Sequence, residues 1–269
     1  MMDIQKYFEK KRKLIDQTLD RYLPKEDEHP QIISKAMRYC VLGGGKRFRP
    51  ILTLAVAETL GGREDIVFPC ACTLELVHTS SLMQDDLPSI DDADLRRGRP
   101  ACHKVFGEAI AVLTAASLNM LALEIFIKNT KGLVGEKILL DVIQVMLKAE
   151  GSEGIVGGEA EDIQAEGKKI TLDALKNIHL KKTGALIKAA ILCGAILSKA
   201  KKEELNILKN YSEHLGLAFQ ITDDILDVTG TLKQLGKNPG ADREKMKNTY
   251  PSLVGLPKSK MLAKEERDA

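Results

Sequence analysis

The sequence predicts an all-α protein, and three observations lead to that prediction. Apolar residues recur at helical spacing, for example at Leu205, Leu208, Leu215 and Phe219. Stretches in which apolar and polar residues alternate with the period of a β-strand are rare. Aromatic residues make up only 4% of the chain, tryptophan is absent, and Ala, Leu, Lys and Glu dominate. We therefore expect a single domain over residues 1–269, built as a bundle of about ten or more helices.

Segments rich in glycine or proline mark the expected helix ends. They are Gly43–Pro50, Leu60–Asp65, Asn129–Glu136, Glu150–Glu159 and Val228–Asp242. Apolar positions at helical spacing fill the stretches between these breaks. No internal repeat and no linker-like segment divides the chain, so we expect one continuous core.

Composition and charge exclude several classes of partner. A formal net charge of +2 gives no reason to expect nucleic acid or an anionic membrane. The five cysteines include no second pair with metal-ligand spacing, and the N-terminus is too charged for a signal peptide. The apolar run from Ala185 is interrupted by Lys188 and is too short to span a bilayer. We expect a reduced cytoplasmic protein with no stable membrane insertion.

The stretch QDDLPSIDDADLRRGRP, from Gln84 to Pro100, contains a dense cluster of aspartates followed by three arginines. A helix that starts at about Pro69 carries His78, Leu82 and Asp85 on one face. Pro88 disfavours helical geometry at the preceding residue, so this helix should end near Asp86. The aspartates then lie at the negative end of the helix dipole, which is locally unfavourable.

A second acidic cluster, QITDDILDVTG, places Gln220, Asp223, Asp224 and Asp227 along one side of a helix that Gly230 should end. Two carboxylates about 4 Å apart repel by about 1 kcal/mol in water and about 4 kcal/mol at an intermediate dielectric. Each cluster taken alone could be a solvated helix end. Two sets of oxygen ligands without Cys or His, however, suit Mg²⁺, which bridges carboxylates to substrate phosphates while arginines contact the remaining phosphate oxygens. Together the clusters predict a metal–diphosphate site.

These motifs resemble those of the trans-isoprenyl diphosphate synthases, the polyprenyl synthetase family of farnesyl and geranylgeranyl diphosphate synthases. DDLPSIDDADLRRGRP is similar to the first aspartate-rich motif of the family in its longer form, and DDILD is similar to the second. GGGKRFRP, KKTGALI and LGKNPGAD followed by KNTYP occur in the order that the family shows. The resemblance runs from about Arg38 to the end of the chain. It implies the isoprenoid synthase fold, in which helices surround a central cavity.

The resemblance also implies roles for individual residues. The ligands of a three-Mg²⁺ cluster would be Asp85, Asp91 and Asp223, with Asp86, Asp224 and Asp227 as additional or water-mediated ligands. The allylic diphosphate would be held by Arg96, Lys182 and Lys237, and isopentenyl diphosphate by Lys46, Arg49, His78 and Arg97. The oxygen dipoles of Thr183 and Gln220 would face the allylic cation. A homodimer is also implied. His78 could equally be a packed core histidine, and Lys46, Arg49 and Lys182 could be ordinary surface cations.

The implied reaction is the head-to-tail condensation of isopentenyl diphosphate with dimethylallyl, geranyl or farnesyl diphosphate. Ser80 and Ser81, about one helical turn before Asp85, should lie on the wall of the tunnel that holds the growing prenyl tail. In the family a bulky aromatic residue at the position of Ser80 limits the product to C15. Its absence favours a C20 product, although Met120 or Leu121 could supply another floor.

Several residues depart from the family pattern and keep two other functions open. Glu159 stands where the family usually has Gln, and Ala115 and Ala116 replace the usual Gly-Asp. By the same comparison we expect the chain to lack the usual C-terminal helices, which would affect lid closure. A catalytically weak regulatory subunit that binds prenyl diphosphates is one alternative, and a terpene cyclase of the same fold is the other. A cyclase has no use for Lys46 and Arg49, and a divergent subunit should have lost some of the aspartates.

Overall fold

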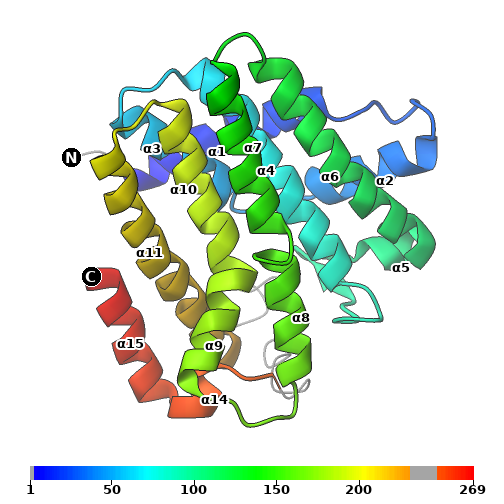
Figure 1. Cartoon of the computed structure of the whole chain (residues 1–269). Coiled ribbons are helices and arrows are strands. Elements are labelled where there is room, and N and C mark those ends of the chain that lie inside the picture. Colours follow the sequence, from blue (N-terminus) through cyan, green and yellow to red (C-terminus); the bar gives the residue numbers. More distant parts are fainter. Residues whose placement is uncertain (1–2, 231–246) are drawn as a thin grey trace. The chain divides into compact units, whose positions relative to one another are not determined.

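The computed structural model describes residues 3–230 and 247–269, and this part of the chain is almost entirely helical (Figure 1). The first helices are α1 (Ile4–Tyr22), α2 (Gln31–Val41), α3 (Phe48–Thr59), α4 (Glu64–Asp85), α5 (Cys102–Phe106) and α6 (Glu108–Thr130). They are followed by α7 (Glu136–Glu150), α8 (Ile155–Ala165), α9 (Leu172–His179), the π-helix η1 (Leu180–Gly184), α10 (Ala185–Leu197), α11 (Lys202–Thr229), α14 (Tyr250–Val254) and α15 (Leu256–Asp268). The prediction of an all-α protein is confirmed.

The described strands form one small hairpin that the periodicity of the sequence does not reveal. Strands β1 (Leu95–Arg96) and β2 (Arg99–Pro100) pair antiparallel, with Leu95 opposite Pro100. The two residues of the turn, Arg97 and Gly98, have positive φ values of 54° and 75°. A two-residue turn with both residues left-handed matches the twist of a hairpin. The arginine motif therefore forms a rigid turn rather than an open loop.

Both acidic clusters lie where the helix-end signals place them. Helix α4 ends at Asp85 with Asp86 as its C-cap, and α11 ends at Thr229 with Gly230 as its C-cap. The helix that carries the first acidic cluster was predicted to start at about Pro69. This start is wrong, because α4 begins at Glu64 and contains Pro69. A proline has no backbone N–H, so the helix loses the hydrogen bond to the carbonyl four residues earlier. Here that carbonyl belongs to Asp65, in the first turn of α4, where the side chain of Asp65 is exposed.

The chain divides into two compact units, which are described separately. The first comprises Met1–Ile143 with Cys193–Ala200, and the second comprises Gln144–Leu192 with Lys201–Ala269. The single domain expected over residues 1–269 stays a prediction. Each unit contains one of the two acidic clusters.

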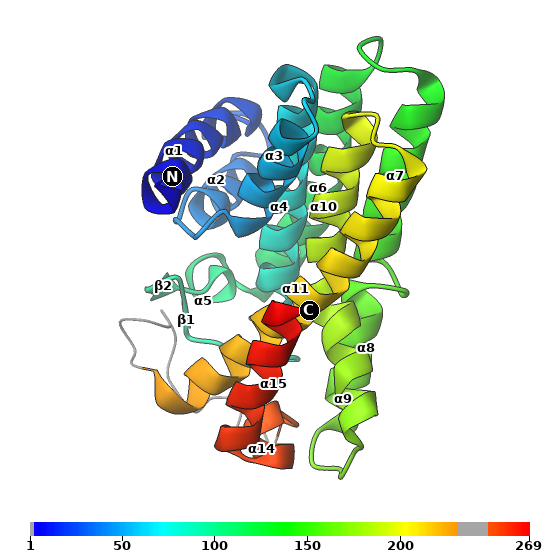
Figure 2. The ribbon, with the colours of Figure 1, turned by 90° about the vertical axis from the view of Figure 1, so that its left-hand side faces the viewer.

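Helix α4 forms the core of the first unit and packs mainly against α3 and α6. Figures 1 and 2 both show α6 running alongside α4. Two hydroxyl groups on α4 bond to backbone carbonyls of α6: Thr73 donates to Ala122 at 2.9 Å, and Ser80 donates to Ala115 at 3.0 Å. Small side chains and hydroxyl bonds of this kind let the two helices approach closely. The end of α4, which carries Asp85, is thereby anchored in a tightly packed core.

Two helices in the described part of the chain, α4 and α6, are long and apolar enough to cross a membrane by length and composition. For α4, 78% of the most apolar window is buried, as in the core helix of a soluble protein. For α6 the buried share is only 39%. Leu113, Met120 and Ile127, spaced seven residues apart, lie exposed on its outer face. Such spacing is typical of a helix face that packs against another helix.

The second unit is built around contacts of η1 with α8 and α11. Two glycines make these contacts possible. A Cβ atom on Gly158 of α8 would lie 2.3 Å from the backbone nitrogen of Lys182, and one on Gly216 of α11 would lie 2.9 Å from the Cα of Gly184. Helix α15 lies alongside α11 (Figure 2). The predicted break at Glu150–Glu159 is partly wrong, since α8 already begins at Ile155.

Candidate active site

In the first unit, the chain folds back over the end of α4 after Asp85. The backbone N–H of Asp91 donates to the Asp85 carbonyl at 2.9 Å, and that of Ala93 donates to the Asp86 carbonyl at 3.2 Å. These bonds satisfy carbonyl groups that a helix end leaves without an intrahelical partner. The backbone of Asp91 is thus held against that of Asp85, as a shared site for the first aspartate-rich motif requires.

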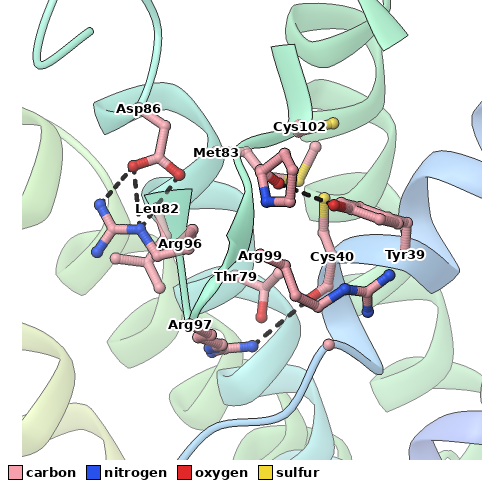
Figure 3. A pocket seen from close by; sticks show the side chains of 12 residues that line it. Tyr39, Cys40, Thr79, Leu82, Met83, Asp86, Arg96, Arg97, Arg99 and Cys102 are labelled. Carbon is pink, nitrogen blue, oxygen red and sulfur yellow. Dashed lines mark hydrogen bonds and ion pairs between the residues drawn. The ribbon is translucent and has the colours of Figure 1, made fainter. Parts of the chain in front are cut away.

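Arg96 compensates the negative charge at this helix end. Its Nε donates to both carboxylate oxygens of Asp86, at 3.0 and 3.2 Å, and its Nη2 contacts the same carboxylate (Figure 3). Burial lowers the pKa of Arg96, but its bond to Asp86 and the charges of Asp86, Asp85 and Asp91 outweigh that effect and raise it. Nη1 of Arg96 makes no hydrogen bond within residues 3–230 and 247–269. Arg96 therefore sits among the three carboxylates with one nitrogen available for a phosphate oxygen.

A group of arginines surrounds His78 on the same helix. Burial holds the pKa of His78 well below its usual range, and nearby positive charges lower it further. In order of effect, those charges belong to Arg49, Arg97, Arg96 and Arg47. His78 is half-buried. Three of the residues expected to bind isopentenyl diphosphate, namely Arg49, His78 and Arg97, thus lie within electrostatic range of one another.

The glycine-rich loop lies against the arginine hairpin. A Cβ atom on Gly45 would lie 3.0 Å from Cζ of Arg97, and Gly45 has a φ of 132°. Nη1 of Arg97 donates to the Cys40 carbonyl at 3.3 Å (Figure 3). The absence of a side chain at Gly45 therefore makes room for the Arg97 guanidinium. Lys46, which follows in the same loop, is exposed.

A small cavity of about 30 Å³ opens between α2, α4 and the arginine hairpin (Figure 3). It is lined by Tyr39, Cys40, Gly43, Thr79, Leu82, Met83, Asp86, Arg96, Arg97, Arg99, Pro100 and Cys102. This volume is close to that of one water molecule. Cations from the hairpin and the apolar face of α4 meet here, beside the Asp86 carboxylate.

In the second unit, the KKT motif lies in the π-helix η1. Nζ of Lys182 lies 2.7 Å from a carboxylate oxygen of Glu159 and 2.7 Å from one of Asp162, both on α8. Single-turn π-helices occur frequently at functional sites. The ammonium group predicted to hold the allylic diphosphate is thus present, and in this structure it contacts two carboxylates.

Thr183, Gln220 and Asp224 form a hydrogen-bonded chain. The Thr183 hydroxyl donates to Oε1 of Gln220 at 2.5 Å, and Nε2 of Gln220 donates to Oδ1 of Asp224 at 2.9 Å. Oδ2 of Asp224 accepts the backbone N–H of Tyr250 at 2.9 Å. Both oxygens of the buried Asp224 are therefore engaged within the protein. Asp223, on the adjacent position of α11, is partly exposed.

The predicted site residues fall into two groups, one in each unit. The first group contains Asp85, Asp86, Asp91, Arg96, Arg97, Arg49 and His78, with Lys46 on the adjoining loop. The second group contains Lys182, Thr183, Gln220, Asp223, Asp224 and Asp227. Lys237 lies outside the described residues.

The carboxylate oxygens at both helix ends are suitable ligands for a hard divalent cation. Carboxylate oxygens are the ligands that Mg²⁺ prefers, and no His or Cys occurs in either aspartate motif. Among the described residues, no three His, Cys, Asp or Glu side chains converge as a ready-made ion site. Mg²⁺ is commonly bound by one or two carboxylates together with water and substrate phosphates, so a complete protein cage is not required.

The buried ion pair between Arg47 and Glu75 escaped the sequence analysis. Arg47 is buried, with only 1% of its surface exposed, and its Nη1 donates to Glu75 at 2.7 Å. It also donates from Nε to Asp16 and from Nη2 to the Val41 carbonyl. The sequence could have indicated this pair, because Glu75 lies in an otherwise apolar stretch and a buried carboxylate requires a cation. Arg47 therefore holds the glycine-rich loop to α4, whereas its neighbours Lys46 and Arg49 were the predicted ligands.

Comparisons with known proteins identify the family. A family model described as polyprenyl synthetase matches residues 30–267. The chain is 41% identical to geranylgeranyl pyrophosphate synthase 4 of Arabidopsis thaliana over 99% of its length and 72% of the relative's. It is 41% identical to farnesyl diphosphate synthase of Bacillus subtilis over 91% of its length and 83% of the relative's.

Solved structures give the same result. A geranyltransferase from Helicobacter pylori, crystallised with magnesium and isoprenyl diphosphate, matches with a TM-score of 0.88 and 32% identity over 98% of this chain and 88% of that one. A farnesyl/geranylfarnesyl diphosphate synthase from Zymomonas mobilis matches with a TM-score of 0.85 and 33% identity over 98% and 89%. Given the two acidic helix ends, the KKT motif and these matches, the chain belongs to the polyprenyl synthetase family of trans-prenyltransferases.

Proposed function

We propose that this short-chain trans-prenyltransferase condenses isopentenyl diphosphate with an allylic diphosphate to give geranylgeranyl diphosphate (C20) in preference to farnesyl diphosphate (C15). The observation that carries the proposal is the arrangement at the end of α4, where Arg96 bonds to Asp86 and lies within the electrostatic influence of Asp85 and Asp91. Paired acids and a guanidinium of this kind suit a substrate that arrives as a diphosphate with divalent cations.

We assign residues of the first unit to the binding of Mg²⁺, of the allylic diphosphate and of isopentenyl diphosphate. Asp85 and Asp91 would ligate Mg²⁺, and Asp86, which is held by Arg96, would act through water. Arg96 would donate to the allylic diphosphate from Nη1. Isopentenyl diphosphate would be held by Arg49, His78 and Arg97, with Lys46 reaching in from the exposed loop.

In the second unit, Asp223 would ligate Mg²⁺, with Asp224 and Asp227 as supporting residues. Lys182 would hold the allylic diphosphate, and Lys237 would join it. Three Mg²⁺ ions bound at the two clusters would draw negative charge from the departing diphosphate. Because the Thr183 hydroxyl donates a hydrogen bond to Gln220, its oxygen lone pairs remain to face the allylic cation.

The chain's residues act by position and charge, and no side-chain nucleophile is required. Lys182 and Arg96 stabilise the diphosphate as the allylic C–O bond breaks. The double bond of isopentenyl diphosphate then forms the new C–C bond to the allylic carbon. A proton is lost from the adjacent carbon of the isopentenyl unit to the released diphosphate, which restores a double bond.

The C20 preference is supported by Ser80, which is small and has 0% of its surface exposed. Its hydroxyl points to α6, so the wall at this level is formed by two helices rather than by α4 alone. Met120 is an unsuitable tunnel floor, since 66% of its surface is exposed on the outer face of α6. Leu121 is half-buried and is retained as a possible contact for the end of the product.

We further propose a cytoplasmic homodimer in which the outer face of α6, formed by Leu113, Met120 and Ile127, packs against a second copy. Burial of such a stripe removes apolar surface from water. All five cysteines are free thiols, which suits a reducing compartment. Leu113→Glu with Met120→Glu should convert the dimer to monomer in sedimentation velocity, and an unchanged dimer would contradict this interface.

One assay tests the proposed reaction against its alternatives. The protein is incubated with Mg²⁺, isopentenyl diphosphate and each allylic diphosphate in turn, and the products are analysed before and after phosphatase treatment. C20 prenyl alcohol after phosphatase is the expected result. Cyclic hydrocarbons would identify a terpene cyclase, and binding of prenyl diphosphates without turnover would identify a regulatory subunit.

A further inference from the structure

Helix α8 directs two carboxylates at one ammonium group. Glu159 Oε2 and Asp162 Oδ2 each lie 2.7 Å from Nζ of Lys182. The two acids are three positions apart, so they lie on the same face of α8. One carboxylate is sufficient to neutralise one lysine, so Glu159 and Asp162 together carry more negative charge than Lys182 alone balances.

The position of these carboxylates is set by backbone packing. A Cβ atom on Gly158 would lie 2.3 Å from the nitrogen and 2.7 Å from the Cα of Lys182. The backbones of α8 and η1 are therefore in direct contact at this point. Glu159 follows Gly158 immediately, so this contact holds the backbone of Glu159 close to that of Lys182.

Glu159 is buried, with 7% of its surface exposed, and its Oε1 accepts no hydrogen bond from the part of the chain that the structure describes. A buried carboxylate oxygen without a donor is costly and uncommon. Lys247 contributes a second ammonium, with Nζ 3.6 Å from Asp162 Oδ2. Two lysines, with a formal charge of +2, thus face two carboxylates, with a formal charge of −2.

We propose that Glu159 is a positioning residue that weakens the hold of Lys182 on a diphosphate, and so tunes the affinity of this enzyme for the allylic substrate and for released diphosphate. A diphosphate that approaches Lys182 meets the negative charge of Glu159 at short range, and this repulsion opposes binding. The inference rests on the proposed function, in which Lys182 contacts the allylic diphosphate. A glutamine at this position would keep the shape and remove the charge.

The test is the isosteric variant Glu159→Gln in the full-length protein. Its dissociation constant for inorganic diphosphate in the presence of Mg²⁺ is measured by titration calorimetry beside that of the wild type. We expect binding to tighten by about tenfold, which corresponds to about 1.4 kcal/mol of relieved repulsion. In steady-state assays the KM for the allylic diphosphate should fall, while the KM for isopentenyl diphosphate should not change.

Glu161→Gln is the matched control. Glu161 lies on the same helix and pairs with Lys181, the residue beside Lys182. Glu161→Gln also removes one negative charge from α8, but that charge does not contact Lys182. Diphosphate affinity should therefore stay within about twofold of the wild type, in line with the small effect of surface ion pairs. In a Lys182→Gln background, Glu159→Gln should have much less effect, because the ammonium through which it acts is absent.

The outcomes separate this inference from the proposed function. Tighter binding in Glu159→Gln alone supports it. If the wild type binds diphosphate and elongates, and Glu159→Gln binds diphosphate with the same affinity as the wild type, the proposed role of Glu159 is wrong. The proposed function would not be affected by that result. A wild type that neither binds diphosphate nor elongates would overturn both. If Glu159→Gln fails to fold, as judged by circular dichroism, Glu159→Met takes its place, since it also removes the charge at similar volume.

Discussion

The hydroxyl of Ser80 on α4 donates a hydrogen bond to the backbone carbonyl of Ala115 on α6, at 3.0 Å. The two residues lie opposite each other where α4 approaches its acidic end, and both are buried. Ala115 is one of the positions at which the chain departs from its family. A side chain larger than alanine there would compete with this contact, so the packing of α4 on α6 depends on both residues being small.

Ser80→Phe should shorten the main product from C20 to C15 and should also lower stability. A phenylalanine adds volume between two packed helices, which typically costs about 1–3 kcal/mol. Product analysis measures the first effect, and urea unfolding measures the second. Ser152→Phe is the matched control, because Ser152 is exposed in the turn before α8 and does not belong to the predicted tunnel wall. An unchanged product in Ser80→Phe would contradict the assignment of the tunnel wall.

Arg47→Met should destabilise the protein by about 3–5 kcal/mol, since it leaves the buried Glu75 carboxylate without its main cation. Chemical unfolding provides the measurement. Arg63→Met removes an exposed arginine that pairs with Asp65, and its cost should stay below about 1 kcal/mol. Equal losses for the two variants would show that Arg47 does not hold the glycine-rich loop as its burial indicates.

Asp85→Asn and Asp223→Asn should each reduce kcat by about 10²-fold or more, because each removes a charge at a position where the leaving diphosphate is stabilised. The circular dichroism spectrum should not change. Asp94→Asn, in the segment that follows Asp85, provides the comparison, since Asp94 is exposed and its carboxylate pairs with Lys104 on the surface. Retained activity in both Asp85→Asn and Asp223→Asn would exclude the metal role.

Gly158→Ala should lower both stability and activity. The new methyl group would lie 2.3 Å from the backbone nitrogen of Lys182, so α8 and η1 would have to separate. Strain of this kind typically costs about 1–3 kcal/mol and would displace the lysine. Gly135→Ala should be tolerated, because a Cβ atom there has no neighbour within 4 Å. Thermal melting and steady-state kinetics would show the difference.

Stability should decrease as the pH falls from 6.5 towards 4, in part because of His179. Burial lowers the pKa of His179 from 6.5 to about 4, although the charge of Asp162 opposes the shift. Between these values the unfolded chain binds a proton that the folded protein does not, so the free energy of unfolding falls with pH, by up to about 3 kcal/mol. Urea unfolding at several pH values should show a weaker dependence in His179→Gln. His29→Gln is the control, because His29 is exposed, and the pH dependence of stability should be the same as in the wild type.

The positions of both acidic clusters were predictable because their causes are local. Pro88 ends α4 and Gly230 caps α11 through backbone geometry that depends on a few adjacent residues. The start of α4 was mispredicted for a related reason. A proline in the first turns of a helix is tolerated when the packing of the remaining turns outweighs one lost bond, and that packing is not a local property.

By itself, the sequence determined the class of fold, the ends of the two acidic helices and the chemistry of the groups placed there. Only the tertiary structure decided which charges meet: Arg96 with Asp86, Arg47 with Glu75, and two carboxylates with Lys182. These partners are separated in sequence by intervals that follow no helical period. Their pairing depends on how helices pack, and close approaches at glycines such as Gly158 set that packing.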